Sequence, residues 1–220
     1  WGNKHPQGSI MQTIGDVDKL TNFYEYQLYC KSLYASIQKF TKATMRALKK
    51  KSEDQYIEMI LNKYDIEDRR EERVYTIDPA SSKDFDDGFS ITSLDNNTWK
   101  LSVYISNVSL WLDILDLWDS FSRRIATIYL PDRRRPMLPT ILSDALCSLQ
   151  EDRSRFAFTL DVIVENYIIK HISYRNTCIR VTKNFAYDSE ELERSQDYQI
   201  LSKVVKGMNN ERKYVDNIRD

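Results

Sequence analysis

The sequence predicts an α+β fold, in which helical segments stand towards both ends of the chain and strands lie between them. Apolar residues recur every three or four positions between residues 18 and 61 and again between 190 and 218, which is typical of amphipathic helices. Apolar and polar residues alternate between 88 and 105 and between 155 and 181, which indicates strands. Both kinds of pattern in one chain favour helices packed against a sheet.

Length and charge set the broad class of the protein. A chain of 220 residues is long enough to bury the core of one or two domains. It contains no run of eighteen apolar residues, which excludes a membrane span, and residues 1–7 lack the regions of a secretory signal. The net charge of −1 gives no overall attraction to nucleic acid, so any RNA binding requires a local basic surface.

The cysteines indicate the compartment. Cys30, Cys147 and Cys178 are odd in number, far apart, and form no Cys-x-x-Cys pair. This usage favours reduced thiols in a cytosol-like environment. We therefore expect a cytoplasmic location, with the nucleus as the alternative, and no secretion.

The first fifty residues combine one short strand with helices. Residues 5–16 predict a turn, a short alternating strand and a second turn. Helical spacing then runs from 18 to 51 over two helices, with Asp18 as the expected N-cap of the first. His5 stands next to a proline in a turn, which favours a structural role over a ligand role.

Four tyrosines in this helical region allow two interpretations. They could stack on RNA bases, or they could pack in the core and at its edge. Helical spacing favours packing, which we expect for Tyr24, Tyr26, Tyr29 and Tyr34.

The rest of the chain alternates between helices, strands and loops. A boundary is expected at Lys49–Lys51, followed by a short helix over 56–61 and a charged connector over 65–73. The later elements are, in order, strands at 88–91 and 100–105 joined by a turn at 95–98, a helix over 115–128, strands over 155–164 and 168–181, and a helix over 190–218.

The segment from Thr76 to Gly88 contains four aspartates within ten residues, which are Asp78, Asp84, Asp86 and Asp87. If they share one site, each pair of carboxylates about 6 Å apart repels by about 3 kcal/mol at an effective dielectric constant of about 20. A compensating cation is then needed near neutral pH. Because no histidine or cysteine stands nearby, these hard oxygen ligands predict Mg²⁺ or Mn²⁺ and not zinc.

The acidic segment also fits a solvated turn, because Pro79 and Gly88 are turn-forming residues. A calcium loop is a further alternative, but it requires Gly at position 6 and Glu at position 12. Counted from Asp84, those positions hold Phe89 and Asp95, which excludes the calcium loop.

A basic segment rich in proline runs from Tyr129 to Pro139. Its prolines exclude a regular helix and predict a rigid loop with solvent-facing arginines at Arg133, Arg134 and Arg135. Three consecutive arginines are in general a solvated run, but beside a carboxylate site phosphate contact is the stronger interpretation. Tyr129 itself could equally be a core residue.

Two blocks of sequence are informative together. The first reads T-I-D-P-A-S-S-K-D-F-D-D-G over 76–88, and the second reads Y-L-P-D-R-R-R-P-M-L-P-T-I-L-S-D-A-L-C-S-L over 129–149. In spacing and order they resemble the RNB family, the exoribonucleases related to ribonuclease II and ribonuclease R. A shorter likeness, His-Pro-x-Gly-x-Ile over 5–10, resembles the end of the OB-like cold-shock domain that precedes the nuclease domain in that family.

The resemblance implies a domain order. Residues 1–50 correspond to the end of the OB-like domain and a helical connector. Residues 51–220 correspond to the N-terminal half of an RNB catalytic domain, with a mixed sheet and helices. The catalytic arginine and glutamate found later in the family have no counterpart before Asp220. We therefore expect residues 1–220 alone to bind Mg²⁺ at best and not to degrade RNA processively.

The resemblance also implies an activity, which is 3′-to-5′ hydrolysis of single-stranded RNA to nucleoside monophosphates. It implies Mg²⁺, or Mn²⁺ in its place, held by Asp78, Asp84 and Asp87. Asp86 is either a further ligand or the residue that positions water. Tyr129 inherits the role of stacking on a base near the RNA 3′ end, and the arginines at 133–135 are the expected phosphate contacts.

The chain departs from the family pattern at three places. Tyr104 and Asn107 stand where His and Asp are usual, and Gly88 stands where Ala is common. These changes leave every candidate metal ligand in place but bear on positioning near the site. Two alternative functions therefore stay open: a catalytically inactive RNA-binding member of the family, and a metal-dependent phosphoesterase that acts on a substrate other than RNA.

Overall fold

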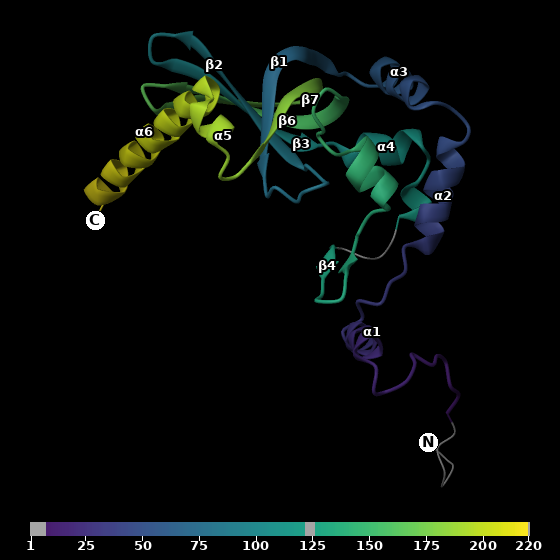
Figure 1. The fold of residues 1–220 in the computed structure, drawn as a ribbon. Helices are drawn as coiled ribbons and strands as arrows, with labels where there is room; N and C mark the ends of the chain where they lie inside the picture. Colours follow the sequence, from purple (N-terminus) through teal and green to yellow (C-terminus); the bar gives the residue numbers. More distant parts are fainter. Residues whose placement is uncertain (1–7, 122–125, 220) are drawn as a thin grey trace.

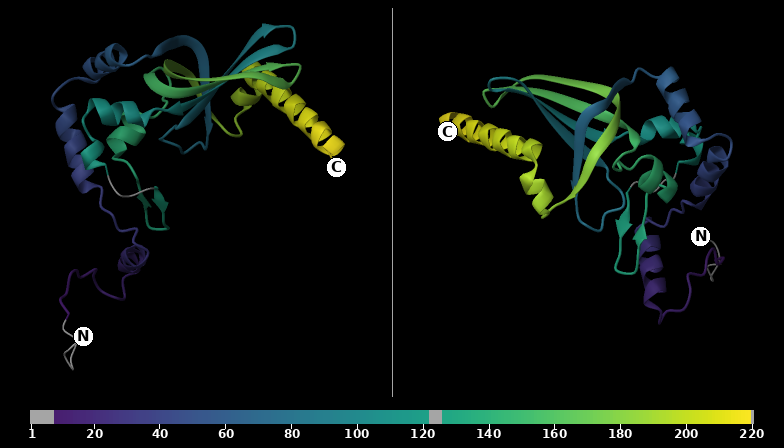
Figure 2. Two further views of the ribbon diagram at one scale, coloured as in Figure 1. Left: turned by 180° about the vertical axis from the view of Figure 1, so that it is seen from behind. Right: turned by 45° about the horizontal axis from the view of Figure 1, so that its top comes forward.

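The computed structural model describes residues 8–121 and 126–219, with side chains up to residue 212. Its centre is a closed five-stranded barrel (Figure 1). Around the barrel the strands follow the order β1, β2, β3, β6 and β7, with the bounds Glu67–Asp78, Asp87–Asp95, Thr98–Ser106, Ser154–Glu165 and Ile168–Ala186. Helices lie on two opposite sides of it, α2 to α4 on one side and α5 and α6 on the other (Figure 2).

The barrel combines antiparallel and parallel pairing. Strands β2, β3, β6 and β7 follow one another as antiparallel neighbours. Strand β1 pairs antiparallel with β2 and closes the barrel by pairing in parallel with β7. The expected α+β fold with a mixed sheet is therefore confirmed.

Strand β1 occupies a segment that the sequence analysis did not predict as a strand. Most of the segment 65–73, expected to be a charged connector, belongs to β1, so that prediction is wrong. Charged residues fit this strand because alternate side chains point into and out of the barrel. Arg69, only 5% exposed, pairs with Asp161 inside it. The register of β1 against β7 also shifts around Val74, and such bulges break the period-two pattern.

The other expected strands are confirmed. Strands β2 and β3 form a hairpin, and Asn97 in its turn has a φ of +70°, in the left-handed region that Asn tolerates. Strands β6 and β7 form a second hairpin, with Asn166 and Tyr167 at φ of +51° and +66°. Strand β7 extends beyond the expected end at residue 181.

Four short helical elements lie on one side of the barrel or close to it: α2 (Gln38–Leu48), α3 (Glu53–Lys63), α4 (Val108–Ile114) and the 3-10 turn η1 (Trp118–Ser120). Their core contains Phe40 and Trp111 together with Phe156 from β6. Ser52 caps α3, because its Oγ accepts a hydrogen bond from Gln55 N while the Gln55 side chain accepts one from Ser52 N. The short helix expected over 56–61 is thus confirmed as part of α3.

The helix expected over 115–128 is not formed in its described part, so that prediction is wrong. Helix α4 ends before this range, and Asp116 adopts a φ of +53°. Both leucines that flank Asp116 are buried in the core, so the chain turns here, and a left-handed residue ends the helix. Arg123 and Arg124, which were expected on this helix, lie outside the described residues.

Two helices cover the opposite side of the barrel, α5 (Glu190–Arg194) and α6 (Gln196–Arg219). The single helix expected over 190–218 is interrupted at Ser195, whose ψ of 121° is extended. Helix α6 packs Val204 against Trp99 of the barrel. Val205, the next residue of the same helix, is 39% exposed.

The strand expected within 5–16 is not formed in its described part, because residues 8–16 form neither helix nor strand. These residues pair with no strand in the described part of the chain, and a strand needs a partner. An OB-like unit is therefore not seen here. Helix α1 (Leu20–Cys30) begins after Lys19, which makes no side-chain capping bond, so the cap expected at Asp18 is wrong.

Most of the tyrosines near α1 are exposed to solvent. Exposure is 51% for Tyr26, 43% for Tyr29 and 55% for Tyr34, whereas Tyr24 is half-buried. Helix α1 contributes only Leu28 to the buried residues, so few of its side chains can pack in a core. The expectation of packing is wrong for the three exposed tyrosines.

The cysteines are free, as expected, with Cys147 and Cys178 buried and Cys30 exposed. Among the helices that the structure describes, none is long and apolar enough to cross a bilayer.

Candidate active site

The four aspartates of the acidic segment gather at one end of the barrel. Asp78 is the last residue of β1, Asp87 is the first residue of β2, and the connecting loop carries Asp84 and Asp86. Both ends of the loop are anchored, because Asp78 O and Asp86 O accept backbone hydrogen bonds of 3.0 and 2.8 Å. The second of these bonds comes from Ser106 at the end of β3, so the β2–β3 hairpin helps to hold the loop.

The second sequence block, residues 129–149, also holds this loop in place through hydrogen bonds. Phe85 N donates to Ser148 Oγ at 3.0 Å, and Phe85 O accepts from Leu149 N at 2.8 Å. The Phe85 ring packs against the apolar cluster that closes this end of the barrel and contains Leu149. Two blocks that are far apart in the sequence therefore meet at the aspartates.

Arg134 reaches the aspartates from the basic segment. This segment is a short hairpin of β4 (Ile128–Tyr129) and β5 (Arg134–Arg135), and the π-helix η2 (Ile141–Leu146) follows it. Arg134 Nη1 donates to Asp84 Oδ2 at 2.7 Å, and Nη2 donates to Asp144 Oδ2 at 3.2 Å. The three side chains are partly exposed, at 29%, 28% and 24%. The hairpin thus carries a positive charge into the carboxylate cluster.

The carboxylates disfavour one another's ionised form. Desolvation, followed by the charges of Asp84, Asp87 and Asp144, raises the pKa of Asp86. The Asp86 side chain is still accessible to water, which screens this effect. Desolvation is also the largest cause of the raised pKa of Asp78, and the charges of the other three aspartates add to it. The loop therefore carries an excess of negative charge.

The donor chemistry of the cluster fits a divalent cation. The side chains offer carboxylate oxygens, which suit Mg²⁺ or Mn²⁺, and Asp78 Oδ2 is buried without a hydrogen-bond partner. In the part of the chain that the structure describes, no three His, Cys, Asp or Glu side chains lie close enough together to hold a metal ion. Asp84 instead turns to Arg134. The structure brings the four aspartates to one place without closing a ligand set.

The three arginines of the basic segment differ in environment. The Arg133 side chain is 67% exposed and lies 3.2 Å from Glu25 on α1. Arg135 is buried and pairs with Glu25 at 2.6 Å and with Asp132 at 2.9 Å. The expectation of solvent-facing arginines is confirmed for Arg133 and is wrong for Arg135 and largely for Arg134.

Tyr129 stands on β4 of the same hairpin and is 73% exposed. Its ring is therefore not a core residue, which excludes that alternative. The exposed ring and the exposed Arg133 belong to one hairpin beside the aspartates.

The sequence alone does not identify two residues of this charge network. Asp144 lies inside the second block, on η2, where a single acidic residue in a mostly apolar segment is the only signal. Glu25 is 110 positions from Arg135, and nothing local in the sequence connects them.

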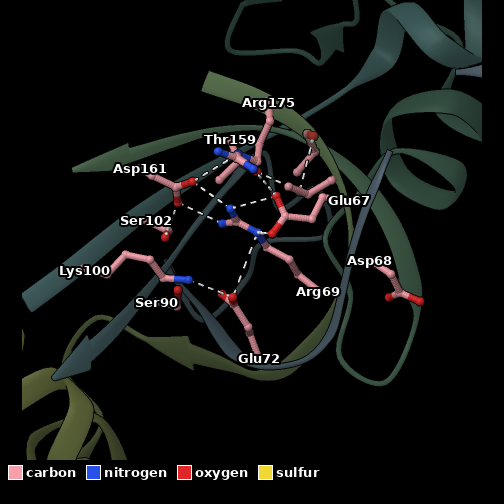
Figure 3. Close-up of polar contacts among 12 residues, drawn as sticks. Glu67, Asp68, Arg69, Glu72, Ser90, Lys100, Ser102, Thr159, Asp161 and Arg175 are labelled. Atoms are coloured by element: carbon pink, nitrogen blue, oxygen red, sulfur yellow. Dashed lines mark hydrogen bonds and ion pairs between the residues drawn. The ribbon is translucent and has the colours of Figure 1, made fainter. Parts of the chain in front are cut away.

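A second group of charges lies inside the barrel, around the early part of β1 (Figure 3). Arg69 donates two hydrogen bonds to Asp161, at 2.8 and 2.7 Å, and Ser102 Oγ donates a third at 2.6 Å. Arg175 pairs with Glu67 at 2.7 Å. Burial raises the pKa of Asp161, but the hydrogen bonds from Arg69 and Ser102 outweigh this effect, so the pKa is lowered overall.

The departures at Tyr104 and Asn107 belong to the barrel and not to the aspartate loop. Tyr104 OH donates to Glu72 Oε2 at 2.9 Å, and Lys100 Nζ lies 2.8 Å from Glu72 Oε1. Burial, as the largest cause, raises the pKa of Tyr104 to about 12. Asn107 donates to Asn176 Oδ1 at 2.9 Å. Both residues therefore act on barrel packing.

Gly88 follows Asp87 at the start of β2 and lies against β1. A Cβ atom at this position would lie 3.0 Å from Tyr75 O, a tight contact with the backbone. The close approach of the two strands accounts for the glycine and leaves the carboxylates unaffected.

The sequence of this chain is similar to those of known proteins. A profile described as the RNB domain matches residues 66–203, which is more than half of the chain. DIS3-like exonuclease 2 of Schizosaccharomyces pombe is 37% identical over 94 residues, which cover 42% of this chain and 10% of the relative. Exoribonuclease 2 of Cronobacter sakazakii is 36% identical over 135 residues, which cover 59% of this chain and 21% of the relative.

A solved structure shares the fold. RNase R of Mycoplasma genitalium, in complex with ribose methylated single-stranded RNA, matches with a TM-score of 0.69 and 22% identity, over 92% of this chain and 32% of that chain. At this identity the likeness shows the fold alone. The chain spans about a third or less of the length of each of these proteins.

Proposed function

This chain belongs to the RNB domain family, and we propose that it forms part of the active site of a metal-dependent 3′-to-5′ exoribonuclease. The proposed reaction is hydrolysis of single-stranded RNA to nucleoside monophosphates. The observation that carries the proposal is the gathering of Asp78, Asp84, Asp86 and Asp87 at one end of the barrel. The names of the matched relatives, an exonuclease and an exoribonuclease, support RNA as the substrate class.

The proposed metal ligands are Asp78, Asp84 and Asp87, with Mg²⁺ or Mn²⁺ as the ion. The buried, unpartnered Asp78 Oδ2 supports this assignment, because a buried carboxylate oxygen requires a partner. When bound, the ion supplies polarisation of the scissile phosphate and a hydroxide drawn from water. Asp86, accessible and with a raised pKa, is proposed to orient the attacking water and to hold its proton at a carboxylate oxygen.

The β4–β5 hairpin is the proposed RNA contact. Tyr129 can stack on a base with its exposed ring, and such stacking contributes about 1–3 kcal/mol per base. Arg133 is exposed and can contact a phosphate, since guanidinium groups match phosphate oxygens. Arg134 and Arg135 belong to the same proposed surface, but their present ion pairs with carboxylates hold the hairpin in place.

The proposed division of the chain places the end of an OB-like domain and a helical connector at 1–50 and the N-terminal half of the catalytic domain at 51–220. Phe40 of α2 packs in the same core as Trp111 of α4, so this part of the connector is attached to the catalytic part. Glu25 of α1 pairs with Arg135 of the hairpin.

A second candidate function is an RNA-binding protein without catalysis. It is favoured by the ion pair between Arg134 and Asp84, which neutralises one proposed metal ligand. In that case Tyr129 and Arg133 would still bind RNA, and no hydrolysis would follow.

The test uses the protein expressed from its complete reading frame and a 5′-labelled single-stranded RNA. We expect shortening from the 3′ end and release of nucleoside monophosphates with Mg²⁺, and no reaction with EDTA. A DNA strand of the same sequence tests the preference for the 2′-hydroxyl group.

The other outcomes separate the alternatives. A gel shift without cleavage supports the non-catalytic RNA-binding protein, and neither binding nor cleavage supports a phosphoesterase acting on another substrate.

A further inference from the structure

The aspartate loop already holds a cation that belongs to the protein. Arg134 donates to Asp84 at 2.7 Å, a short charge-assisted hydrogen bond, and it donates to Asp144 at 3.2 Å with its other terminal nitrogen. Attraction to these two carboxylates raises the pKa of Arg134 and outweighs the opposing effect of burial, which is the largest single cause. Among the described residues, the ion pairs made by Asp84 and Asp144 go to this one arginine.

The hairpin that carries Arg134 is tied to α1. The next residue, Arg135, is buried and pairs with Glu25 of α1 at 2.6 Å, and it pairs with Asp132 of the same hairpin at 2.9 Å. Movement of β5 away from α1 would break the ion pair between Arg135 and Glu25. A change of partner by the Arg134 side chain alone leaves that ion pair intact.

We propose that Arg134 is a tethered counter-ion of the aspartate loop, which a divalent metal ion displaces from Asp84 and which Asp144 then retains. The inference rests on the proposed function only in taking Asp84 as a metal ligand. It adds Arg134 and Asp144 to the site as positioning residues that set the affinity for the metal.

Competition follows from the chemistry of the carboxylate. The Asp84 oxygen that accepts the Arg134 bond shares its negative charge with the guanidinium and is a weaker ligand for a metal ion, and a guanidinium and a divalent cation repel each other at close range. Metal binding therefore includes the cost of breaking the bond from Arg134 to Asp84. Removing the guanidinium removes that cost.

Asp144 lowers the cost of displacement because it gives Arg134 a second partner. It already accepts from Arg134 and from Ser143 Oγ, and it stands on η2 beside the loop. After displacement the guanidinium keeps one carboxylate and is not left unpaired. Loss of Asp144 should therefore hold Arg134 more firmly on Asp84 and weaken metal binding.

The experiment titrates the protein with Mn²⁺ alone and follows free Mn²⁺ by electron paramagnetic resonance. We expect Arg134→Gln to bind Mn²⁺ about tenfold more tightly than the wild type, as loss of one charge-assisted contact implies. Arg134→Lys keeps the charge but loses the planar two-nitrogen geometry, so its dissociation constant should lie between the two. Arg133→Gln removes a charge one position away that does not reach Asp84, and it should change the constant less than about twofold.

A double-mutant cycle tests whether Asp144 acts through Arg134. Asp144→Asn should weaken Mn²⁺ binding in the wild type, and the same change in an Arg134→Gln background should have little effect. If Asp144 acts only as one more negative charge, the two effects are equal, and the proposed role of Asp144 is overturned. Circular dichroism of each variant shows that it is folded. If Arg134→Gln is unfolded, Arg134→Lys decides the question.

Equal affinity in wild type and Arg134→Gln, weaker binding by Arg134→Gln, or no Mn²⁺ binding by either would overturn the inference. RNA degradation is measured in a separate assay. A result can therefore contradict the counter-ion role of Arg134 without contradicting the nuclease function, or the reverse. Tighter Mn²⁺ binding by Arg134→Gln in a protein that does not cleave RNA would support the counter-ion and refute the nuclease.

Discussion

Two groups of charged side chains in this protein differ in their balance of positive and negative charge. In the barrel, the cations Arg69, Lys100 and Arg175 face the carboxylates Glu67, Glu72 and Asp161, and each has a partner of opposite charge (Figure 3). At the end of the barrel, Arg134 is the cation paired with a cluster of aspartates. One buried atom in each group, Arg69 Nε and Asp78 Oδ2, lacks a hydrogen-bond partner. The charges of the barrel group are matched, and those of the aspartate loop are not.

The difference shows what each group can do. A network with matched charges around the buried pair of Arg69 and Asp161 fixes the position of its strands, since breaking that pair leaves a buried charge without its closest partner. A cluster with unmatched charge is costly in itself and becomes favourable when a cation arrives. Charge balance therefore separates the structural network from the candidate functional site, although both lie along β1.

The largest expected effect is on the barrel network. Asp161→Asn removes the buried charge that faces Arg69 and should lower the free energy of unfolding by about 3 kcal/mol, because the buried guanidinium then keeps only the more exposed Glu67 and Glu72 as partners. Urea denaturation measures this change. The matched control Arg194→Gln breaks an exposed pair with Glu190 and should cost less than about 0.5 kcal/mol. A loss below about 1 kcal/mol in Asp161→Asn would contradict the structural role of the network.

The next effect concerns activity at the aspartate loop. Asp86→Asn in the protein expressed from its complete reading frame should lower RNA cleavage by about a hundredfold or more, because one charged group that acts on the reacting water is lost. RNA binding, measured by gel shift, should be retained, since Tyr129 and Arg133 are untouched. Asp188→Asn, at an exposed position, serves as the control. Cleavage by Asp86→Asn within tenfold of the wild type would refute the assignment.

A smaller effect is the response of stability to metal. At a free Mg²⁺ concentration of ten times the dissociation constant, the free energy of unfolding should rise by about 1.4 kcal/mol. Excess EDTA should reverse the gain. Asp87→Asn, which lacks one proposed ligand, should lose most of the response, whereas Asp188→Asn should keep it. An equal gain in both variants would place the metal elsewhere.

The smallest expected effect is on how the stability of the protein depends on pH. This dependence should have opposite signs for Asp86 in the aspartate loop and Asp161 in the barrel. The pKa of Asp86 is raised in the folded protein, so its contribution to stability is present at low pH and is lost as pH rises. The pKa of Asp161 is lowered, so its contribution is present above about pH 4 and is lost as pH falls.

Urea denaturation between pH 3 and 7 gives the free energy of unfolding of the wild type, Asp86→Asn and Asp161→Asn, and the differences show the sign of each pH dependence. Asp86→Asn should match the wild type near the acid end and become more stable than it by about 0.5 kcal/mol near neutral pH, since water screens this accessible carboxylate. The advantage of the wild type over Asp161→Asn should shrink towards the acid end. The same sign of pH dependence in both variants would remove the distinction between the groups.

Local sequence patterns predict much of this fold. Alternation of apolar and polar residues identified β6, β7 and the β2–β3 hairpin, and helical spacing identified α2 and α3. The pattern failed where tertiary packing decides the structure. The early part of β1 is highly charged because its inward side chains meet partners from β6 and β7. The chain leaves the helix at Asp116 because leucines on both sides enter the core.

By itself, the sequence determined that four aspartates stand at Asp-x5-Asp-x-Asp-Asp spacing, that a second block accompanies them, and that the chain forms an α+β fold of the RNB family. Only the tertiary structure decided which charges face one another. Arg134 meets Asp84 across 50 positions, Arg69 meets Asp161 across 92, and Arg135 meets Glu25 across 110. The physical reason is that local spacing fixes periodicity and chemical type, whereas a partner so distant in the chain is chosen by how the strands close the barrel and where its hairpins end.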